Sequence, residues 1–250
     1  MTKILILGGT RDAVGLAKSL SDQEGLTVTY SLAGVTVAPV LPDCEVRRGG
    51  FGGVDGLRAF LEEERFDALL DATHPYAATM AESAARACEA LKLPRLKYLR
   101  PAWEPEDGDD WTRVLSAAEA VPHLRDAKRI FLTIGVRGLE PFGELGDAWF
   151  LVRFINQPEA PLPLPAHEVL IDRGPFTHEG EMALLKEHRI DALVTKNSGG
   201  HLVGAKLTAA RALGIPVLMI DRPRFPDGPS VSSEEDVLTW AAGLTPIDRT

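Results

Sequence analysis

The most constraining feature of this chain is a regular alternation of short apolar segments with longer amphipathic ones. The apolar segments predict buried strands at residues 3–7, 27–31, 45–47, 67–71, 95–99, 129–133, 149–155, 168–171, 192–195 and 217–220. The longer segments predict helices at residues 12–21, 55–64, 77–91, 179–188 and 202–213. Ser232 and Glu235 have the spacing of a capping box, which predicts the start of a final helix. Because strands that alternate with helices form parallel sheets covered by helices, the sequence predicts an α/β fold.

A segment rich in proline, aspartate and glycine, residues 101–110, divides this alternation into two halves. Such a composition is typical of a domain boundary. We therefore expect two Rossmann-like lobes with parallel sheets and a cleft between them. Residues 1–105 are predicted to form an N-terminal dinucleotide-binding lobe, and residues 106–250 a C-terminal α/β lobe that binds the substrate.

Charge and length limit the partners of the chain. The 250 residues carry a formal net charge of -9, which argues against nucleic acid or an anionic membrane as the main partner. The first apolar run is too short for a signal peptide or a membrane span, so we expect a cytoplasmic protein. We further expect a monomer, with a weak homo-oligomer as the alternative. Cys44 and Cys88 lie far apart and no Cys/His cluster is present, so no metal site is predicted.

A glycine-rich turn follows the first predicted strand and precedes a helix. It reads Gly8, Gly9, Thr10 and Arg11, with Ala13 where a dinucleotide-binding motif has its last glycine. Glycines at this place permit close approach of a diphosphate, and the helix N-terminus supplies amide donors. We predict that these first four residues bind a dinucleotide, the alternative being an ordinary turn between strand and helix.

The end of the second strand indicates which nicotinamide is used. Dehydrogenases that prefer NAD usually place an acidic residue here, about 20 residues after the glycines. This chain has Ser31, Gly34 and Thr36 and no carboxylate. A small hydroxyl residue beside an open glycine loop favours a 2′-phosphate, so NADPH is the predicted cofactor and NADH the alternative. Ser31 capping the turn would equally account for its presence.

Two further clusters follow predicted strands in the first half. Asp71, Thr73, His74 and Tyr76 end the fourth strand, where a nicotinamide ring would lie. His74 and Tyr76 are the predicted catalytic residues because either side chain can donate a hydrogen bond or a proton. Asp71 and Thr73 are expected to bind the cofactor, or to cap the next helix. The glycines of residues 49–53 are predicted to bring backbone amides to the cofactor, chiefly at Gly52 and Gly53.

The second half carries a cationic loop at the corresponding strand end. A lysine, an amide and a hydroxyl beside glycines make a loop suited to binding carboxylates. Most surface arginines are merely solvated, so only part of the neighbouring cations is expected to touch a ligand. The predicted substrate-binding residues are Arg173, Lys196, Asn197, Ser198, Gly199, Lys206 and Arg222.

Together these segments resemble the precorrin-6A reductase family of corrin (vitamin B12) biosynthesis. The matching motifs occur in family order over nearly the whole chain. They are ILILGGTRDA from Ile4, SLAG from Ser31, GGFGG from Gly49, DATHPYA from Asp71, RGPF from Arg173, KNSGG from Lys196 and KLTAARALGIPVLMIDRP from Lys206. Each motif is weak alone, and their combination is specific.

The resemblance implies reduction of one ring double bond of precorrin-6A or cobalt-precorrin-6A by a nicotinamide hydride. The neighbouring ring carbon must then receive a proton, from His74, Tyr76 or a water. The implied partner is a precorrin-type polycarboxylate macrocycle bound by Lys196, Ser198 and the strand-end arginines. By position, the implied cofactor residues are Gly9, Thr10, Ser31, Gly34, Gly52 and Thr73.

One departure from the family pattern concerns the cofactor. The family often reads SLAGRT, whereas this chain has Val35 in place of the arginine. That arginine would be a natural partner of a 2′-phosphate, so an NADPH preference requires compensation by Arg11, Arg47 or Arg48. Two rival functions stay open: reduction of another polyanionic metabolite, and dinucleotide sensing without catalysis.

Overall fold

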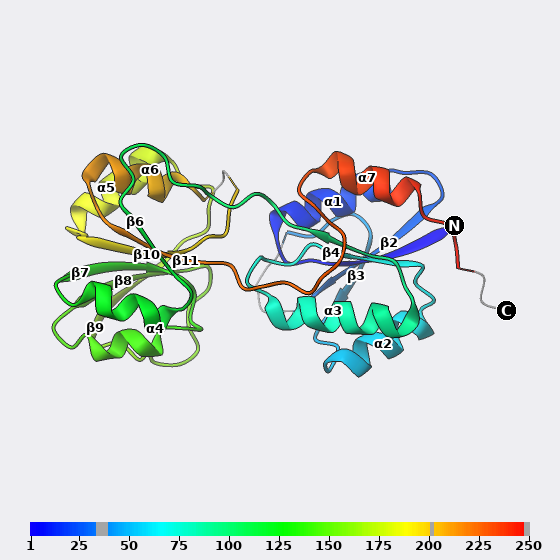
Figure 1. Ribbon diagram of the computed structural model, residues 1–250, viewed down its shortest axis with the longest axis horizontal. Coiled ribbons are helices and arrows are strands. Elements are labelled where there is room, and N and C mark those ends of the chain that lie inside the picture. Colours follow the sequence, from blue (N-terminus) through cyan, green and yellow to red (C-terminus); the bar gives the residue numbers. More distant parts are fainter. Residues whose placement is uncertain (34–39, 201–202, 248–250) are drawn as a thin grey trace. The chain divides into compact units, whose positions relative to one another are not determined.

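The computed structural model describes residues 1–33, 40–200 and 203–247. The chain forms two compact units: unit 1 comprises Met1–Arg100 and Pro223–Thr250, and unit 2 comprises Pro101–Arg222 (Figure 1). Each unit contains a six-stranded sheet whose described strand pairs run parallel. The predicted α/β class with two parallel sheets is confirmed. No helix in the described ranges is long and apolar enough to cross a membrane.

Unit 1 has the strand order of a dinucleotide-binding fold. Its sheet runs β3-β2-β1-β4-β5-β12. The strands are β1 (Thr2–Leu7), β2 (Leu26–Leu32), β3 (Glu45–Arg48), β4 (Ala68–Asp71), β5 (Arg95–Tyr98) and β12 (Ser230–Val231). Helices α1 (Arg11–Ser21) and α7 (Glu234–Ala242) cover one face, and α2 (Val54–Glu63) and α3 (Ala78–Leu91) cover the other (Figure 1).

Burial on both faces explains the four consecutive apolar residues that end β1, residues 4–7. Ile4 and Ile6 lie in the core beneath α1 and α7, whereas Leu5 and Leu7 lie in the core beneath α2 and α3. Successive side chains of a strand point to opposite faces, so a strand covered on both sides is apolar at consecutive positions and not at every second one. The core therefore fixes β1 at the centre of the sheet, and the glycine turn begins where β1 ends.

Unit 2 repeats this topology. Its sheet runs β9-β8-β7-β10-β11-β6, in which the first five strands match the order in unit 1 and the sixth position is taken by β6, the first strand of the unit along the chain. The strands are β6 (Trp111–Val114), β7 (Arg129–Thr133), β8 (Trp149–Phe154), β9 (Ala166–Ile171), β10 (Ala192–Lys196) and β11 (Val217–Ile220). The helices are α4 (Ala117–Ala120), α5 (His178–Glu187) and α6 (Ala205–Leu213), with short 3-10 turns η1 (Val121–Leu124) and η2 (Glu140–Glu144).

The C-terminal segment differs from the predicted division of the chain. The sequence assigned residues 106–250 to one lobe, whereas the structure returns Pro223–Thr250 to unit 1. The physical reason is that β12 extends the first sheet, where Ser230 pairs with Lys97 in β5. Val237 and Ala241 of α7 are also buried in the core that contains α1. The sixth strand of the first sheet thus comes from a segment that is remote in sequence from the other five.

Each sheet has one point at which the strand order reverses. In unit 1 it lies between β1 and β4, and in unit 2 between β7 and β10. In sheets of this kind, ligands bind beyond the carboxyl ends of the two strands at the reversal. The loops that follow β1 and β4, and those that follow β7 and β10, are therefore the places to look for function.

Candidate functional site

The glycine turn after β1 rests on a buried tyrosine. The Gly9 amide donates a hydrogen bond to the Tyr30 hydroxyl over 2.8 Å. A Cβ atom on Gly8 would lie 2.2 Å from the Tyr30 ring, so only glycine fits there. Burial raises the pKa of the Tyr30 hydroxyl, which keeps it neutral beneath the turn. Tyr30 is a residue that the sequence analysis missed.

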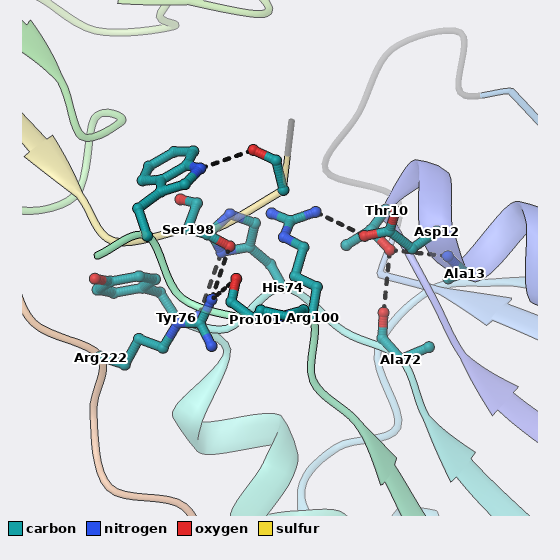
Figure 2. A network of polar contacts seen from close by, with 12 residues as sticks. Thr10, Asp12, Ala13, Ala72, His74, Tyr76, Arg100, Pro101, Ser198 and Arg222 are labelled. Atoms are coloured by element: carbon teal, nitrogen blue, oxygen red, sulfur yellow. Dashed lines mark hydrogen bonds and ion pairs between the residues drawn. The ribbon is translucent and has the colours of Figure 1, made fainter. Parts of the chain in front are cut away.

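Gly9 and Thr10 form the part of the turn that is suited to a diphosphate. Gly9 has φ +105°, and a Cβ atom built on it meets nothing within 4 Å. Thr10 caps α1: its hydroxyl accepts a hydrogen bond from the Ala13 amide at 3.0 Å and donates one to the Ala72 carbonyl at 3.2 Å (Figure 2). Open space above Gly9 and the positive end of α1 fit a dinucleotide diphosphate.

The loop after β4 is held by a buried ion pair. Lys97 Nζ lies 2.9 Å from Asp71 Oδ2, and these side chains are 5% and 0% exposed. The other carboxylate oxygen accepts hydrogen bonds from the Thr73 amide at 3.1 Å and the Thr73 hydroxyl at 2.7 Å. The polar atoms of Asp71 and Thr73 therefore shape the loop, and any contact of these residues with a cofactor stays a prediction.

His74 and Tyr76 lie in the same loop, beside the reversal point. His74 Nδ1 accepts a hydrogen bond from the Tyr76 amide at 3.3 Å, and the two rings have centroids 5.7 Å apart. A neutral imidazole that accepts at Nδ1 carries its proton on Nε2. The structure thus brings both predicted catalytic residues together at the end of β4, while their catalytic role stays a prediction.

Arg100 adds a cation next to the glycine turn. Its guanidinium lies 2.7 Å from the carboxylate of Asp12 in the first turn of α1 (Figure 2). The pair borders a small hollow. Its lining residues are Thr10, Asp12, Ala72, Thr73, Pro75, Tyr98 and Arg100. Arg100 offsets the negative charge that Asp12 places at the helix N-terminus, where a diphosphate would otherwise meet it.

The glycine loop after β3 is organised by Arg47. The guanidinium donates hydrogen bonds to the carbonyls of Gly49 and Gly50 at 2.6 and 2.9 Å and lies 3.9 Å from the ring centroid of Phe51. Gly52 and Gly53 then take φ values of +79° and +92° directly before α2. The loop therefore needs its glycines for its own conformation, and contact with a cofactor stays a prediction.

Four further residues were predicted to bind the cofactor, and the structure describes two of them. Ser31 is only 3% exposed, within β2. Arg11 is exposed at the first position of α1. Gly34 and Thr36 lie outside the described residues, as does Val35.

Lys196 marks the reversal point of the second sheet. It is the last residue of β10, and its Nζ donates a hydrogen bond to the Ile134 carbonyl beyond β7 at 2.6 Å. Burial, and then the charge of Arg137, lowers the pKa of the Lys196 ammonium. The structure thus places a partly desolvated amine at the position that corresponds to the β4 end in unit 1.

The loop after Lys196 is built around Trp103. The Asn197 side chain accepts a hydrogen bond from the Trp103 amide at 2.8 Å and donates one to the Trp103 carbonyl at 3.0 Å. Trp103 in turn donates its indole hydrogen to the Gly200 carbonyl at 2.8 Å. Lys206 is 6% exposed, lies 4.7 Å from the Trp103 ring centroid and donates to the Val203 carbonyl. Asn197 and Lys206 therefore contribute to the internal structure of the loop.

Arg222, which follows β11, supports the same loop. Its guanidinium donates hydrogen bonds to the carbonyls of Asn197 at 2.8 Å and of Ser198 and Pro101 at 3.2 Å (Figure 2). A Cβ atom on Gly199 would lie 2.0 Å from the Pro101 carbonyl oxygen, so glycine is required there. Arg173, by contrast, is exposed just after β9. Substrate binding by any of these residues stays a prediction.

Two of the missed residues left a signal in the sequence. Lys97 interrupts an apolar strand, and a charge inside a buried strand indicates a buried partner. Trp103 is a large aromatic residue in a segment that otherwise has the composition of a linker. Among the residues that the structure describes, no three His, Cys, Asp or Glu side chains group into a site able to hold a metal ion.

Comparisons with known proteins relate the whole chain to one family. Residues 3–242 match the family described as Precorrin-6x reductase CbiJ/CobK. A Precorrin-6A reductase from Rhodococcus erythropolis is 47% identical and aligns over 98% of this chain and 99% of its own length. A Cobalt-precorrin-6A reductase from Priestia megaterium is 31% identical over 94% and 96%. A solved structure described as CobK precorrin-6A reductase superimposes with a TM-score of 0.92 at 43% identity, covering 98% and 99%.

Proposed function

Because this chain belongs to the Precorrin-6x reductase CbiJ/CobK family, we propose that it reduces one ring double bond of precorrin-6A in vitamin B12 biosynthesis. The observation that carries the proposal is the glycine turn at the strand-order reversal of unit 1, where Gly9 opens onto empty space beside the N-terminus of α1. A glycine turn at this point of a parallel sheet, directly before a helix N-terminus, suits the diphosphate of a dinucleotide.

Unit 1 is the proposed cofactor-binding unit. A bound nicotinamide supplies the hydride, which adds to one carbon of the double bond while a proton adds to its neighbour. Gly9 and the first turn of α1 hold the diphosphate, and Thr10 ties this turn to the β4 loop. His74 and Tyr76 stand at the end of β4, and the proton is proposed to come from the Tyr76 hydroxyl, from His74 in its imidazolium form, or from a water that these side chains hold.

Unit 2 is the proposed substrate-binding unit. Precorrins are polycarboxylates, so charge-assisted hydrogen bonds from lysine and arginine are the contacts to expect. Lys196, Ser198 and Arg173 are proposed to touch the carboxylates. Asn197 and Arg222 act through the loop conformation that they support.

The relatives favour the metal-free substrate. Precorrin-6A reductases from Rhodococcus erythropolis and Rhodobacter capsulatus are 47% and 44% identical to this chain. Cobalt-precorrin-6A reductases from Priestia megaterium and Methanococcus maripaludis are 31% and 26% identical. We propose precorrin-6A as substrate, NADPH as the preferred cofactor and the cytoplasm as the location.

Purified protein is expected to consume NADPH when precorrin-6A is added. The measurement is the fall in absorbance of the reduced nicotinamide, followed together with the spectrum of the macrocycle. NADH and cobalt-precorrin-6A serve in parallel reactions to test the two preferences. Tight binding of the dinucleotide without any turnover of either macrocycle would favour the sensor function instead.

Replacing Lys196 with alanine is expected to raise the KM for precorrin-6A at least tenfold, since one charged hydrogen bond contributes about 1.5–3 kcal/mol. The KM for the dinucleotide should change less than twofold, because unit 1 is the proposed cofactor-binding unit. Lys186→Ala provides the control, because Lys186 is an exposed lysine in the last turn of α5. Equal changes in both KM values would show that Lys196 supports the whole site and does not bind substrate.

A further inference from the structure

We infer that Arg48, the last residue of β3, binds the 2′-phosphate of NADPH in this chain. The inference rests on the proposed function, and it adds the residue that determines the choice between the two nicotinamides. The residues that follow β2, 33–40, include no lysine or arginine, and Val35 stands where the resemblance described above often has an arginine. An NADPH preference therefore needs another cation near the end of β2.

The register of the sheet brings Arg48 to that place. Arg48 is the Cα partner of Leu32, the last residue of β2. The pairing continues one step further, because the Gly49 amide donates a hydrogen bond to the Leu32 carbonyl at 3.0 Å. The end of β2 is where dinucleotide-binding folds distinguish a ribose hydroxyl from a ribose 2′-phosphate. Arg48 thus lies beside the end of β2, where the two nicotinamides are distinguished, although β2 and β3 are separated in sequence.

Neighbouring Arg47 cannot take this role because its guanidinium is already used. It donates to the Gly49 and Gly50 carbonyls and stacks on Phe51, which packs in the core beneath α2 and α3. Residues next to each other in a strand point to opposite faces, so Arg48 belongs to the other face, with Val46. Val46 packs against the core beneath α1, the helix that begins at the glycine turn.

The surroundings of Arg48 suit a phosphate. Arg48 is exposed, and β2 ends in a leucine with no carboxylate. The nearest acidic residue of its own strand is Glu45, whose carboxylate accepts a hydrogen bond from the Thr29 hydroxyl at 2.7 Å at the opposite end of β3. Ser31 is buried. A guanidinium with its planar set of donors matches phosphate oxygens better than any other side chain at this edge.

The test is a titration of the purified protein with NADPH and with NADH, followed by the fluorescence of the reduced nicotinamide. Arg48→Ser is expected to raise the Kd for NADPH about tenfold and to leave the Kd for NADH within twofold. Arg48→Lys should recover part of the NADPH affinity, because it keeps the charge and loses the planar donor set. Arg86→Ser is the matched control: Arg86 is an exposed arginine in α3 near the start of β5, at the other edge of the sheet, and its loss should change neither Kd.

The outcomes separate this inference from the proposed function. Wild-type protein that binds neither dinucleotide would overturn both. Wild-type protein that prefers NADPH, with the same preference after Arg48→Ser, would overturn the role of Arg48 and leave the proposed reductase intact. A parallel loss of NADPH and NADH affinity in Arg48→Ser would also overturn it, because a 2′-phosphate contact affects only NADPH.

Discussion

Gly9→Ala is expected to weaken dinucleotide binding at least tenfold while the protein stays folded. The added methyl group would project into the open space above the turn, where we place the diphosphate. Within the described residues, and apart from its two chain neighbours, no atom lies within 4 Å of it, so the expected cost to folding is the backbone strain of φ +105°. Such strain is about 1–3 kcal/mol for one residue. The measurements are the Kd for NADPH by fluorescence titration and the free energy of unfolding in urea.

Gly25→Ala provides the matched control for this substitution. Gly25 has φ +81°, and a Cβ atom on it also meets nothing within 4 Å. Gly25 lies before β2, at the amino ends of the parallel strands, whereas the glycine turn lies at their carboxyl ends. Both variants should lose comparable stability, and only Gly9→Ala should lose cofactor affinity. If the two variants bound NADPH equally well, the turn after β1 would not be the diphosphate site.

The positions of the central strands along the chain could be predicted from the sequence, because burial on both faces leaves continuous apolar runs. The predicted bounds of β7 and β11 are those observed, and β1 differs by a single residue. The sixth strands were missed for a physical reason. β12 has only two residues, and β6 is partly exposed at the edge of its sheet, so neither has an apolar period to detect. Without β12, the return of the C-terminal segment to unit 1 could not be foreseen.

The capping pattern in the sequence predicted the start of the final helix, but it was wrong about the capping residue. The final helix begins where the sequence indicated, but its N-cap is Ser233, whose hydroxyl accepts from the Asp236 amide at 3.1 Å. The predicted capping box used Ser232 and Glu235 and is therefore displaced by one residue. Two serines in succession offer the same chemistry, and only the backbone angles decide between them.

For the candidate site too, the sequence located the loops but did not show which side chains support a loop and which could bind a ligand. Parallel strands end at one edge, so chain order alone located the loops at Gly9 and Lys196. Which side chains support a loop from within depends on hydrogen bonds between distant residues. Asn197 and Trp103 are an example, as are Arg222 and Pro101. Such contacts leave no periodic pattern in the sequence, so supporting residues and ligand-binding residues looked alike.

Lys97→Met is expected to cost about 3–5 kcal/mol of folding free energy, the largest loss of stability that we predict for a single residue here. The substitution leaves the Asp71 carboxylate without its counter-ion in a site where its side chain is 0% exposed. Methionine fills most of the volume of the lysine stem, so the loss measures the unpaired charge and not a cavity. Unfolding of unit 1 in urea, followed by circular dichroism, provides the measurement.

The double variant Asp71→Asn with Lys97→Met separates charge from shape. Asparagine keeps an oxygen that accepts the hydrogen bonds of the Thr73 amide and hydroxyl, and the pair then carries no charge. Replacing both members of a buried ion pair is often close to neutral, so the double variant should recover most of the stability lost in Lys97→Met. If the double variant were as unstable as the single one, the lysine stem and its contacts, such as that with the Phe225 ring, would support the β4 loop more than the ion pair does.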